Sequence, residues 1–346
     1  MNTFRPFLLL LVLVACSSSQ KHLPNASGAP GEILVVMDKG HWESGPGVLV
    51  RSIFEQPIAS LPQREPRFKL VQVPPKAFGS LLLTHHSVLF AAIGQAGDTA
   101  GTGLTPDRYA QGQLFLQVSG ADGAAWERAF ANEADAAVSR FETHQLDRLR
   151  KQVAKERDPE LVASVEKVHD VLLEIPKGYR IMKQDSNFTW LERDRLVSGS
   201  GLEHNVIEGL LIHHQPYRSD TVFSVLNLVN LRDSITKKYV EGPAPGSYMI
   251  VQRSFETLDL MPQGAPTELD GHYAYIMHGL FGMEGAKMGG PFVSMTTVCE
   301  PQVRMITVEG FVYAPQFNKR EYVRELEAIL RSTRFGPKCI PLSTKG

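Results

Sequence analysis

The segment from Asp122 to Arg157 does most to limit how this chain can fold. Its apolar residues lie among many charged side chains, and this pattern predicts one long helix with a mostly solvated surface. Asp122 is suited to cap the helix, because a short carboxylate can accept hydrogen bonds from the free backbone N–H groups of the first turn. The composition changes after this helix, so we expect a domain boundary near residues 158 to 176.

Short aliphatic runs alternate with helix-like segments before the long helix. The runs "EILVVMD", "FKLVQV" and "HSVLFAAIG" are typical of strands. The loose, Gly-containing segment 94–112 is expected to be a loop. Such alternation favours one sheet with helices on a face. We therefore expect residues 32–158 to form an N-terminal α/β domain, a sandwich-like layer that includes the long helix.

Strands dominate the second half of the chain. One helix is expected to begin at Pro159 and to end at Pro176. Successive β-like runs follow, interrupted by an amphipathic helix over residues 221–240 and closed by another over residues 318–333. Adjacent strands of this length favour a mainly antiparallel sheet flanked by helices. Residues 176–346 are therefore expected to form a C-terminal α+β domain, which makes the whole chain α+β.

The first fifteen residues have the layout of a secretory signal. Arg5 precedes an apolar run that is too short to span a bilayer as a permanent helix, which takes about 20 apolar residues. The sequence Leu-Val-Ala-Cys over residues 13–16 looks like the lipobox of bacterial lipoproteins. We expect residues 1–15 to be a removed signal peptide and Cys16 to be acylated, so that lipid holds the chain at a membrane. The alternative is a soluble exported protein with an incidental cysteine.

Residues 16–31 combine Ser, Pro, Gly and Asn with almost no bulky apolar side chain, so we expect a flexible tether. No acidic run follows Cys16, and acidic residues there resemble the surface-export signal of some Bacteroidota lipoproteins. We therefore expect an outer-membrane anchor with the folded body facing the periplasm.

The charge and length of the chain limit its partners and its organisation. The chain has 36 basic and 37 acidic residues, a net charge of −1 at pH 7, so it has no general attraction for nucleic acid or for an anionic surface. No nucleic-acid partner is expected. The 346 residues, 43% of them hydrophobic, favour two domains with substantial cores.

Cys299 and Cys339 remain once Cys16 is assigned to lipidation. The compartment outside the inner membrane is oxidising, so we predict a disulfide between them, with two buried free thiols as the alternative. Neither cysteine has a C-x-x-C partner or a histidine at ligand spacing. The sequence therefore favours neither a zinc site nor a redox motif.

Several longer segments carry a family resemblance. "PGEILVVMDKGHW", "RDSITKKYVEGPAPGSYM", "MGGPFVS" and "VEGFVYAPQFNKREYVRELEAIL" together resemble the Bacteroidota lipoproteins of the domain of unknown function 4837 family. The resemblance covers essentially the whole mature chain. It implies a lipid-anchored envelope protein, and it supplies no assigned activity and no catalytic residues.

No catalytic, metal or cofactor site is evident from the sequence. There is no G-x-S-x-G, and no P-loop or G-x-G-x-x-G pattern in the right context. His213 and His214 are adjacent on an expected strand and so point to opposite faces, which makes them a poor chelating pair. His272 and His278 are too far apart along one strand to share an ion. We expect no catalytic residue, no metal and no cofactor.

Four carboxylates are the candidates for hydrolytic chemistry. They lie on expected strands or strand ends, where a pair can converge as glycoside hydrolysis requires; the four are Asp185, Glu192, Glu208 and Glu309. Polar and apolar residues also alternate along any strand of a half-exposed sheet, and this pattern explains the four carboxylates equally simply.

Thr99 is the candidate modification site, because Asp98-Thr99-Ala100 resembles the acceptor of O-glycosylation in Bacteroidota and lies in an expected loop. Taken together, the sequence favours a non-enzymatic, lipid-anchored envelope protein that binds a protein partner or belongs to an outer-membrane assembly. A hydrolase of cell-wall or glycan material and a small-ligand binding module are the alternatives.

Overall fold

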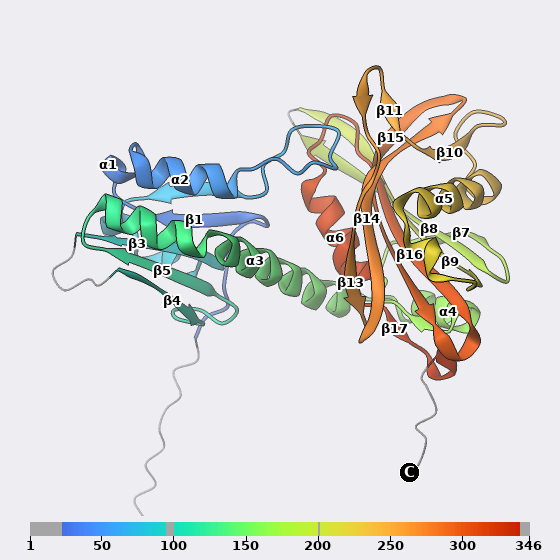
Figure 1. Cartoon of the computed structure of the whole chain (residues 1–346), viewed down its shortest axis with the longest axis horizontal. Coiled ribbons are helices and arrows are strands. Elements are labelled where there is room, and N and C mark those ends of the chain that lie inside the picture. The colour runs from blue at the N-terminus through green and yellow to red at the C-terminus, as the bar shows by residue number, and fades with distance from the viewer. Residues whose placement is uncertain (1–22, 95–99, 200, 340–346) are drawn as a thin grey trace, which may run out of the picture.

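The computed structural model describes residues 23–94, 100–199 and 201–339. The described chain builds two large sheets that lie apart, with the long helix α3 running from one to the other, and two further sheets of two strands each (Figure 1). We call the part that contains the smaller sheet the N-terminal unit and the part that contains the larger sheet the C-terminal unit. The α+β class expected from the sequence is confirmed.

The N-terminal unit is a five-stranded sheet of order β2-β1-β3-β5-β4. β2, β1, β3 and β5 run parallel and β4 is antiparallel to β5. The strands are β1 (Glu32–Val36), β2 (Lys69–Val73), β3 (Ser87–Ile93), β4 (Gly101–Pro106) and β5 (Leu114–Gly120). The expectation of a loop throughout residues 94–112 is wrong where β4 forms. All residues of β4 are exposed, so the strand has no apolar pattern to reveal it.

Helices cover one face of this sheet. They are α1 (Lys39–Trp42), α2 (Gly45–Phe54) and the first half of α3 (Gly123–Glu156). Phe54, Phe130 and Phe141 pack against one another between these helices and the strands. Two 3₁₀ turns, Pro75–Ala77 and Ser80–Thr84, lie toward the other face.

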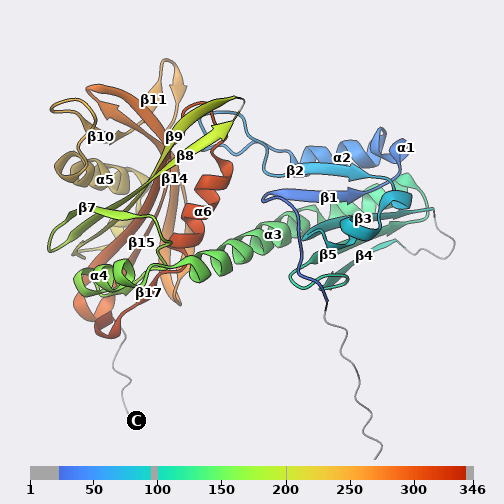
Figure 2. The ribbon, with the colours of Figure 1, turned by 180° about the vertical axis from the view of Figure 1, so that it is seen from behind.

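The helix α3 belongs to both units. The Asp122 carboxylate accepts a hydrogen bond from the Ala125 backbone N–H at 2.7 Å, which is the cap predicted from the sequence. Trp126 and Phe141 lie in the core of the N-terminal unit, whereas Val153 lies in a core of the C-terminal unit. Seen from behind in Figure 2, the helix crosses the whole space between the two sheets.

The C-terminal unit is an eight-stranded antiparallel sheet, with main order β10-β14-β15-β16-β9-β8-β7 and β13 paired with β14. Its strands are β7 (Arg180–Gln184), β8 (Phe188–Gly199), β9 (Leu202–Pro216), β10 (Tyr248–Val251), β13 (Gln263–Leu269), β14 (His272–Glu284), β15 (Ala286–Cys299) and β16 (Arg304–Tyr313). β8 and β9 form one long hairpin that pairs out to Gly199 and Leu202.

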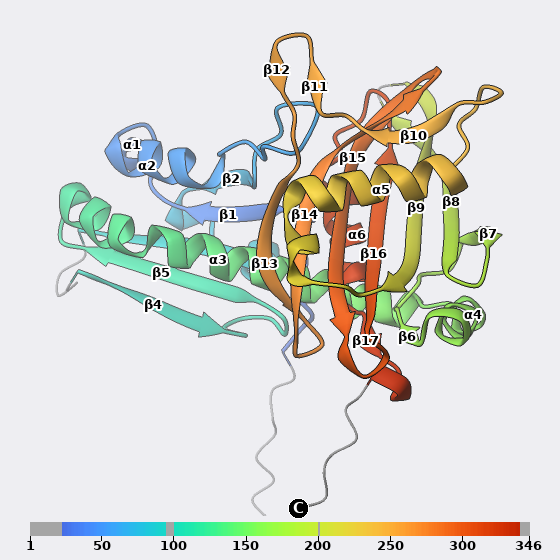
Figure 3. The same ribbon diagram turned by 45° about the vertical axis from the view of Figure 1, so that its right-hand side comes forward.

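A helix covers each face of this sheet. In Figure 3, α5 (Val225–Tyr239) crosses the near face and α6 (Arg320–Leu330) lies behind. Leu228 and Val229 of α5 pack in a core with Phe281 and Phe311. Leu326, Ile329 and Leu330 of α6 pack in a separate core with residues of the opposite face, among them Leu210 and Val308.

The helix α4 (Pro159–His169) is shorter than the sequence predicts. It begins after Asp158, whose carboxylate caps it, and Pro159 occupies its first turn. It ends seven residues before Pro176, because Asp170 adopts a left-handed conformation with φ 55°. The next residues form the short strand β6 (Val171–Leu172), which pairs with β17 (Arg334–Phe335).

The expected tether over residues 16–31 is partly wrong. Asn25 and Ser27 form isolated β-bridges with Gln111 and His85, and Gly31 leads directly into β1. Residues 25–31 therefore belong to the folded body, because backbone groups of the N-terminal unit hold them. Cys16 and the expected signal peptide, residues 1–15, lie outside the described residues.

Candidate functional sites

A cleft of about 590 Å³ lies where the two units meet. The loop 57–61 of the N-terminal unit forms one wall and α6 another, while α3 and the strands β13 and β14 complete it. Its size is within the range of small-ligand sites in proteins, roughly 300–1,000 Å³. The chain segments that build it are far apart in sequence, and hydrogen bonds hold them together.

Those hydrogen bonds join residues 65–67 to the first turns of α6. Glu65 is 2% exposed, and its two carboxylate oxygens accept hydrogen bonds from the backbone N–H groups of Lys319 and Arg320 at 2.7 and 2.9 Å. Arg320 donates to the Pro66 carbonyl at 2.8 Å, and Arg324 donates to the Arg67 carbonyl at 2.6 Å. The wall between the units is therefore built from specific polar contacts.

Cationic side chains from both units reach the cleft. Arg67 comes from the N-terminal unit and Arg320, Arg324 and Arg331 come from α6. Burial lowers the pKa of the Arg324 guanidinium despite the neighbouring Glu321 carboxylate.

One carboxylate is held firmly inside the cleft. Glu327 accepts a hydrogen bond from the Arg331 Nε at 2.7 Å and lies 3.4 Å from the His278 Nε2. Burial by itself raises the pKa of Glu327, but His278 and Arg331 outweigh it and lower this pKa to about 2. Glu327 is therefore ionised at neutral pH and already neutralised by its neighbours.

Uncharged groups complete the lining. Gln145 of α3 is 4% exposed and brings an amide to the floor of the cleft. The apolar part of the lining is contributed by Pro57, Ile58, Leu61, Leu146, Leu149 and Val323. The cleft thus combines an apolar surface with a small number of charged and polar groups, as small-ligand sites do.

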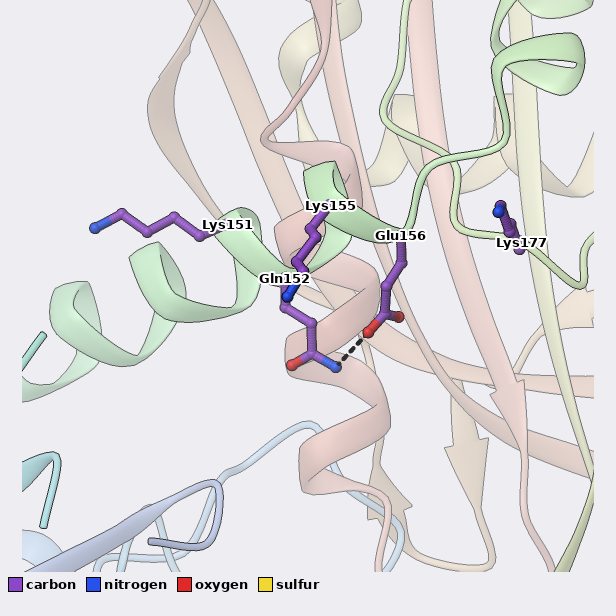
Figure 4. Close-up of a pocket in the computed structure, with 5 residues that line it drawn as sticks. All are labelled: Lys151, Gln152, Lys155, Glu156 and Lys177. Atoms are coloured by element: carbon purple, nitrogen blue, oxygen red, sulfur yellow. Dashed lines mark hydrogen bonds between the residues drawn. The ribbon is translucent and has the colours of Figure 1, made fainter. Parts of the chain in front are cut away.

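A second hollow lies at the end of α3 and is lined by Lys151, Gln152, Lys155, Glu156 and Lys177. Figure 4 shows that these side chains do not converge: Lys151 points away from the others, and Lys177 comes from a separate loop. Two hydrogen bonds join these residues, one between the Gln152 and Glu156 side chains at 3.2 Å and one from the Lys177 backbone N–H to the Glu156 carbonyl at 3.0 Å. This hollow is an open, solvated surface, and it has no built site.

The four candidate carboxylates do not come together. Asp185 is exposed, and Glu192 pairs with Arg180 at 3.0 Å. Glu208 and Glu309 lie on opposite faces of the sheet, since Glu208 shares a face with Leu210 and Glu309 is paired across the strands with Leu211. The expectation that a pair of these groups converges is therefore wrong.

Both buried carboxylates are bound to arginines instead. Arg232 donates two hydrogen bonds to Glu309 through Nε and one through Nη2, at 2.7 to 3.0 Å. Glu208 accepts from Arg193 at 3.0 and 3.1 Å, and the Arg195 guanidinium lies 2.6 Å away. Burial raises the pKa of Glu208 and of Glu309, although the arginines oppose this. These pairs resemble structural ion pairs and leave neither Glu208 nor Glu309 free to attack a substrate.

The histidines occupy ordinary structural positions. His214 contacts His169 across a 3.0 Å Nδ1–Nδ1 distance, whereas His213 lies on the other face of the strand, as the sequence predicts. Burial lowers the pKa of His169 to about 3 and that of His214 to about 4. Within the described ranges, no three His, Cys, Asp or Glu side chains form a group that could hold a metal ion.

Cys299 and Cys339 are joined by a disulfide, with Cα atoms 5.1 Å apart. Cys299 ends β15 and Cys339 follows β17, so the bond attaches the C-terminal segment to the large sheet. Thr99 and Cys16 lie outside the described residues.

A hairpin presents apolar side chains to solvent. β11 (Ser254–Phe255) and β12 (Leu258–Asp259) project beyond the large sheet in Figure 3. Phe255 and Leu258 are cross-strand partners, and they are 58% and 61% exposed.

Comparison with known families identifies both halves of the chain. The model of the family described as domain of unknown function (DUF4837) matches residues 158–332. The chain belongs to the DUF4837 family. The DUF4837 match begins at Asp158, which caps α4, and runs through α6. A second family model, also described as a domain of unknown function (DUF8532), matches residues 26–154.

No curated protein matches the sequence. In the part of the chain that the structure describes, no helix has both the length and the hydrophobicity to cross a bilayer. The DUF4837 match includes the α6 wall of the cleft, and the DUF8532 match includes the loop 57–61 and most of the α3 floor.

The sequence does not single out the residues of the cleft. Arg320, Arg324, Glu327 and Arg331 recur at intervals of three or four residues, so they share one face of the predicted last helix. An ordinary solvent-exposed face of a helix has the same spacing, so the spacing alone does not mark a site. Its meaning depends on the loop 57–61, which lies more than 250 residues earlier in the chain.

Proposed function

We propose that this protein is a lipid-anchored envelope protein that binds a small ligand in the cleft between its two units and has no catalytic activity of its own. The lipobox-like sequence ending at Cys16 supports the anchor. The cleft supports the binding function, because both units line it and it joins an apolar surface to buried polar groups.

The four carboxylates considered for hydrolysis do not support an enzymatic role. Each of the two buried ones is bound to an arginine, and they lie on opposite faces of the sheet. Inverting and retaining glycosidases both need two carboxyl groups that flank one bond. We therefore place the function in binding.

Native mass spectrometry of the gently extracted protein tests this proposal. The expected result is a small molecule that is retained by the wild-type chain and lost from Thr143→Trp, which fills the cleft from its floor. Ala131→Trp is the matched control, because Ala131 is exposed on the same helix outside the cleft. If the wild-type chain and both variants retain the molecule, its binding site lies outside the cleft. If the wild-type chain binds nothing even after incubation with an envelope extract, the proposal is wrong.

Partner binding is a second candidate function, favoured by the β11–β12 hairpin. Phe255 and Leu258 form an apolar pair at the tip of an element that projects into solvent. Affinity purification of the lipid-anchored chain from its native envelope tests this candidate. A partner recovered with the wild-type chain and lost from Phe255→Ser/Leu258→Ser supports it. The same partner recovered with both chains excludes the hairpin as its contact.

A further inference from the structure

We propose that the cleft between the two units binds an anionic amphiphile, a small molecule with a carboxylate or phosphate group on an apolar body. This inference rests on the proposed ligand-binding function and names the chemical class of the ligand. It follows from the charge of the walls, from the state of the carboxylates already present, and from the arrangement of the apolar lining.

The walls carry an excess of positive charge. Four arginines and His278 line the cleft, and the acidic residues among its lining are Glu142 and Glu327. Three charged groups lie just outside the lining: Glu321, which pairs with Arg320 and Arg324, and Glu65 and Lys319, which meet at the start of α6. When these are counted as well, five cationic groups face four carboxylates. An anion in the cleft therefore meets a net attractive field, and low surrounding polarity strengthens this attraction.

Contacts within the protein hold the arginines in position, but some of their N–H groups remain free to donate hydrogen bonds. Arg324 packs over the Phe68 ring at 5.0 Å, donates to the Arg67 carbonyl and lies with 16% of its side chain exposed. Arg331 uses Nε for Glu327 and Nη1 for Thr267, with the Thr267 contact at 3.4 Å. A guanidinium group has five N–H donors in a planar fork, which suits carboxylate and phosphate oxygens. Side chains held in this way need little reordering when a ligand binds.

The carboxylates in the cleft do not exclude an anionic ligand. Glu327 lies between His278 and Arg331, and its lowered pKa shows that the surrounding positive charge dominates there. Glu142 is 48% exposed at its side chain and pairs with Arg67 at 3.3 Å. A competing anion can displace an exposed pair of this kind at small cost, because exposed ion pairs contribute little to stability.

The apolar lining defines the rest of the ligand. Leu146 and Leu149 of α3 lie on the floor, Val323 lies on α6, and Ile58 and Leu61 lie on the opposite loop. A purely inorganic anion leaves this surface in contact with water, whereas an apolar body covers it. The ligand class is therefore an amphiphile, and since the two units both contribute to the cleft, the bound molecule braces them together.

Titration calorimetry on the mature chain, residues 16–346 with Cys16→Ser so that no lipid is attached, tests the proposal with four probes. Octanoate and octyl phosphate carry the two anionic groups, 1-octanol is the neutral analogue, and inorganic phosphate lacks the apolar body. We expect at least one of the two anionic amphiphiles to bind at least tenfold more tightly than 1-octanol and inorganic phosphate, since hydrogen bonds to a charged group are among the stronger ones. Whichever of the two binds more tightly identifies the anionic group.

Variants connect this binding to the cleft. Arg331→Gln and Arg324→Gln are expected to weaken the anionic probe about tenfold or more and to leave 1-octanol unchanged. Lys155→Gln is the matched control, because it removes one positive charge from the open hollow at the end of α3. Thermal unfolding without ligand checks that each variant is folded, and Thr143→Trp blocks the cleft without changing its charge.

Equal binding of octanoate, octyl phosphate and 1-octanol, all lost in Thr143→Trp, overturns the anionic class and leaves the proposed ligand-binding function standing. Binding of the anionic probes that is unaffected by Thr143→Trp and equally weakened by Lys155→Gln shows adherence to surface charge and overturns the inference. If no probe binds, and native mass spectrometry finds no retained ligand, both the inference and the proposed function are wrong.

Discussion

Glu65 and Lys319 are joined by a 2.7 Å hydrogen bond from the Lys319 backbone N–H to the Glu65 carboxylate, although 253 residues separate them in the chain. The second carboxylate oxygen of Glu65 accepts from the Arg320 backbone N–H. A residue of the N-terminal unit thus caps a helix of the C-terminal unit. The negative charge also suits the positive end of the helix dipole.

Replacing Glu65 is therefore expected to loosen the contact between the units. Glu65→Ala leaves the first N–H groups of α6 without a cap, and we expect a loss of about 1–2 kcal/mol, together with faster hydrogen exchange at the start of α6. Urea unfolding and exchange mass spectrometry measure the two effects. Glu55→Ala, at an exposed position, is the control. Unchanged exchange in α6 would falsify the capping role.

The buried pair Arg232–Glu309 is expected to be costly to break from one side. Both residues are at most 4% exposed, so Arg232→Met leaves an unpaired carboxylate in the sheet core, at a cost of about 3–5 kcal/mol. The double variant Arg232→Met/Glu309→Leu is expected to recover most of this loss. Urea unfolding of the two single variants and the double variant completes the cycle.

Lys39→Met provides the comparison for this cycle. Lys39 and Glu43 form a surface pair at 3.6 Å with side chains 80% and 63% exposed. Removing it is expected to leave the unfolding midpoint almost unchanged. A loss as large as that of Arg232→Met would mean that burial does not determine the cost of breaking a pair here.

The disulfide is expected to stabilise the C-terminal unit. Cys299 and Cys339 are 40 residues apart in sequence, and a cross-link of this span contributes about 2–4 kcal/mol, chiefly by restricting the unfolded chain. Urea unfolding with and without reductant measures the effect. The double variant Cys299→Ser/Cys339→Ser must then be insensitive to reductant. A reductant effect that persists in this variant would have another cause.

Acid is expected to destabilise the protein first through a buried and a half-buried histidine. The pKa values of His169 and His214 in the folded state, about 3 and about 4, lie below the ordinary value near 6.5. The unfolded chain therefore binds more protons, and the contribution of these groups is full above about pH 6.5 and is lost as the pH falls toward 3. Only one of two facing Nδ1 atoms can donate, so protonation of the accepting ring also breaks their hydrogen bond.

Two measurements check this pH dependence. The urea midpoint should fall between pH 6.5 and pH 4, and the ring signals of His169 and His214 in NMR spectra should not titrate between pH 8 and pH 5. Glu327, with a folded pKa of about 2, adds a loss at lower pH, between about 4.5 and 2. Ring titration near pH 6 in the folded protein contradicts the prediction.

The sequence by itself determined the elements whose signals are local. The helix α3 and its Asp122 cap, the start of α4 at Pro159, and the strands of alternating or continuous apolar residues all follow from spacing and capping rules. The edge strand β4 escaped prediction because all its residues are exposed. The end of α4 escaped it because one backbone turn at Asp170, and no proline or glycine, stops the helix.

Only the tertiary structure decided which side chains meet. Glu208 and Glu309 look alike in the sequence, yet strand register places them on opposite faces, each beside its own arginine. The cleft depends on the loop 57–61, the middle of α3 and the helix α6, three segments with no local signal for one another. Local sequence patterns indicate which secondary structure each segment forms. Packing of distant segments decides which charges are neutralised and which remain to bind a ligand.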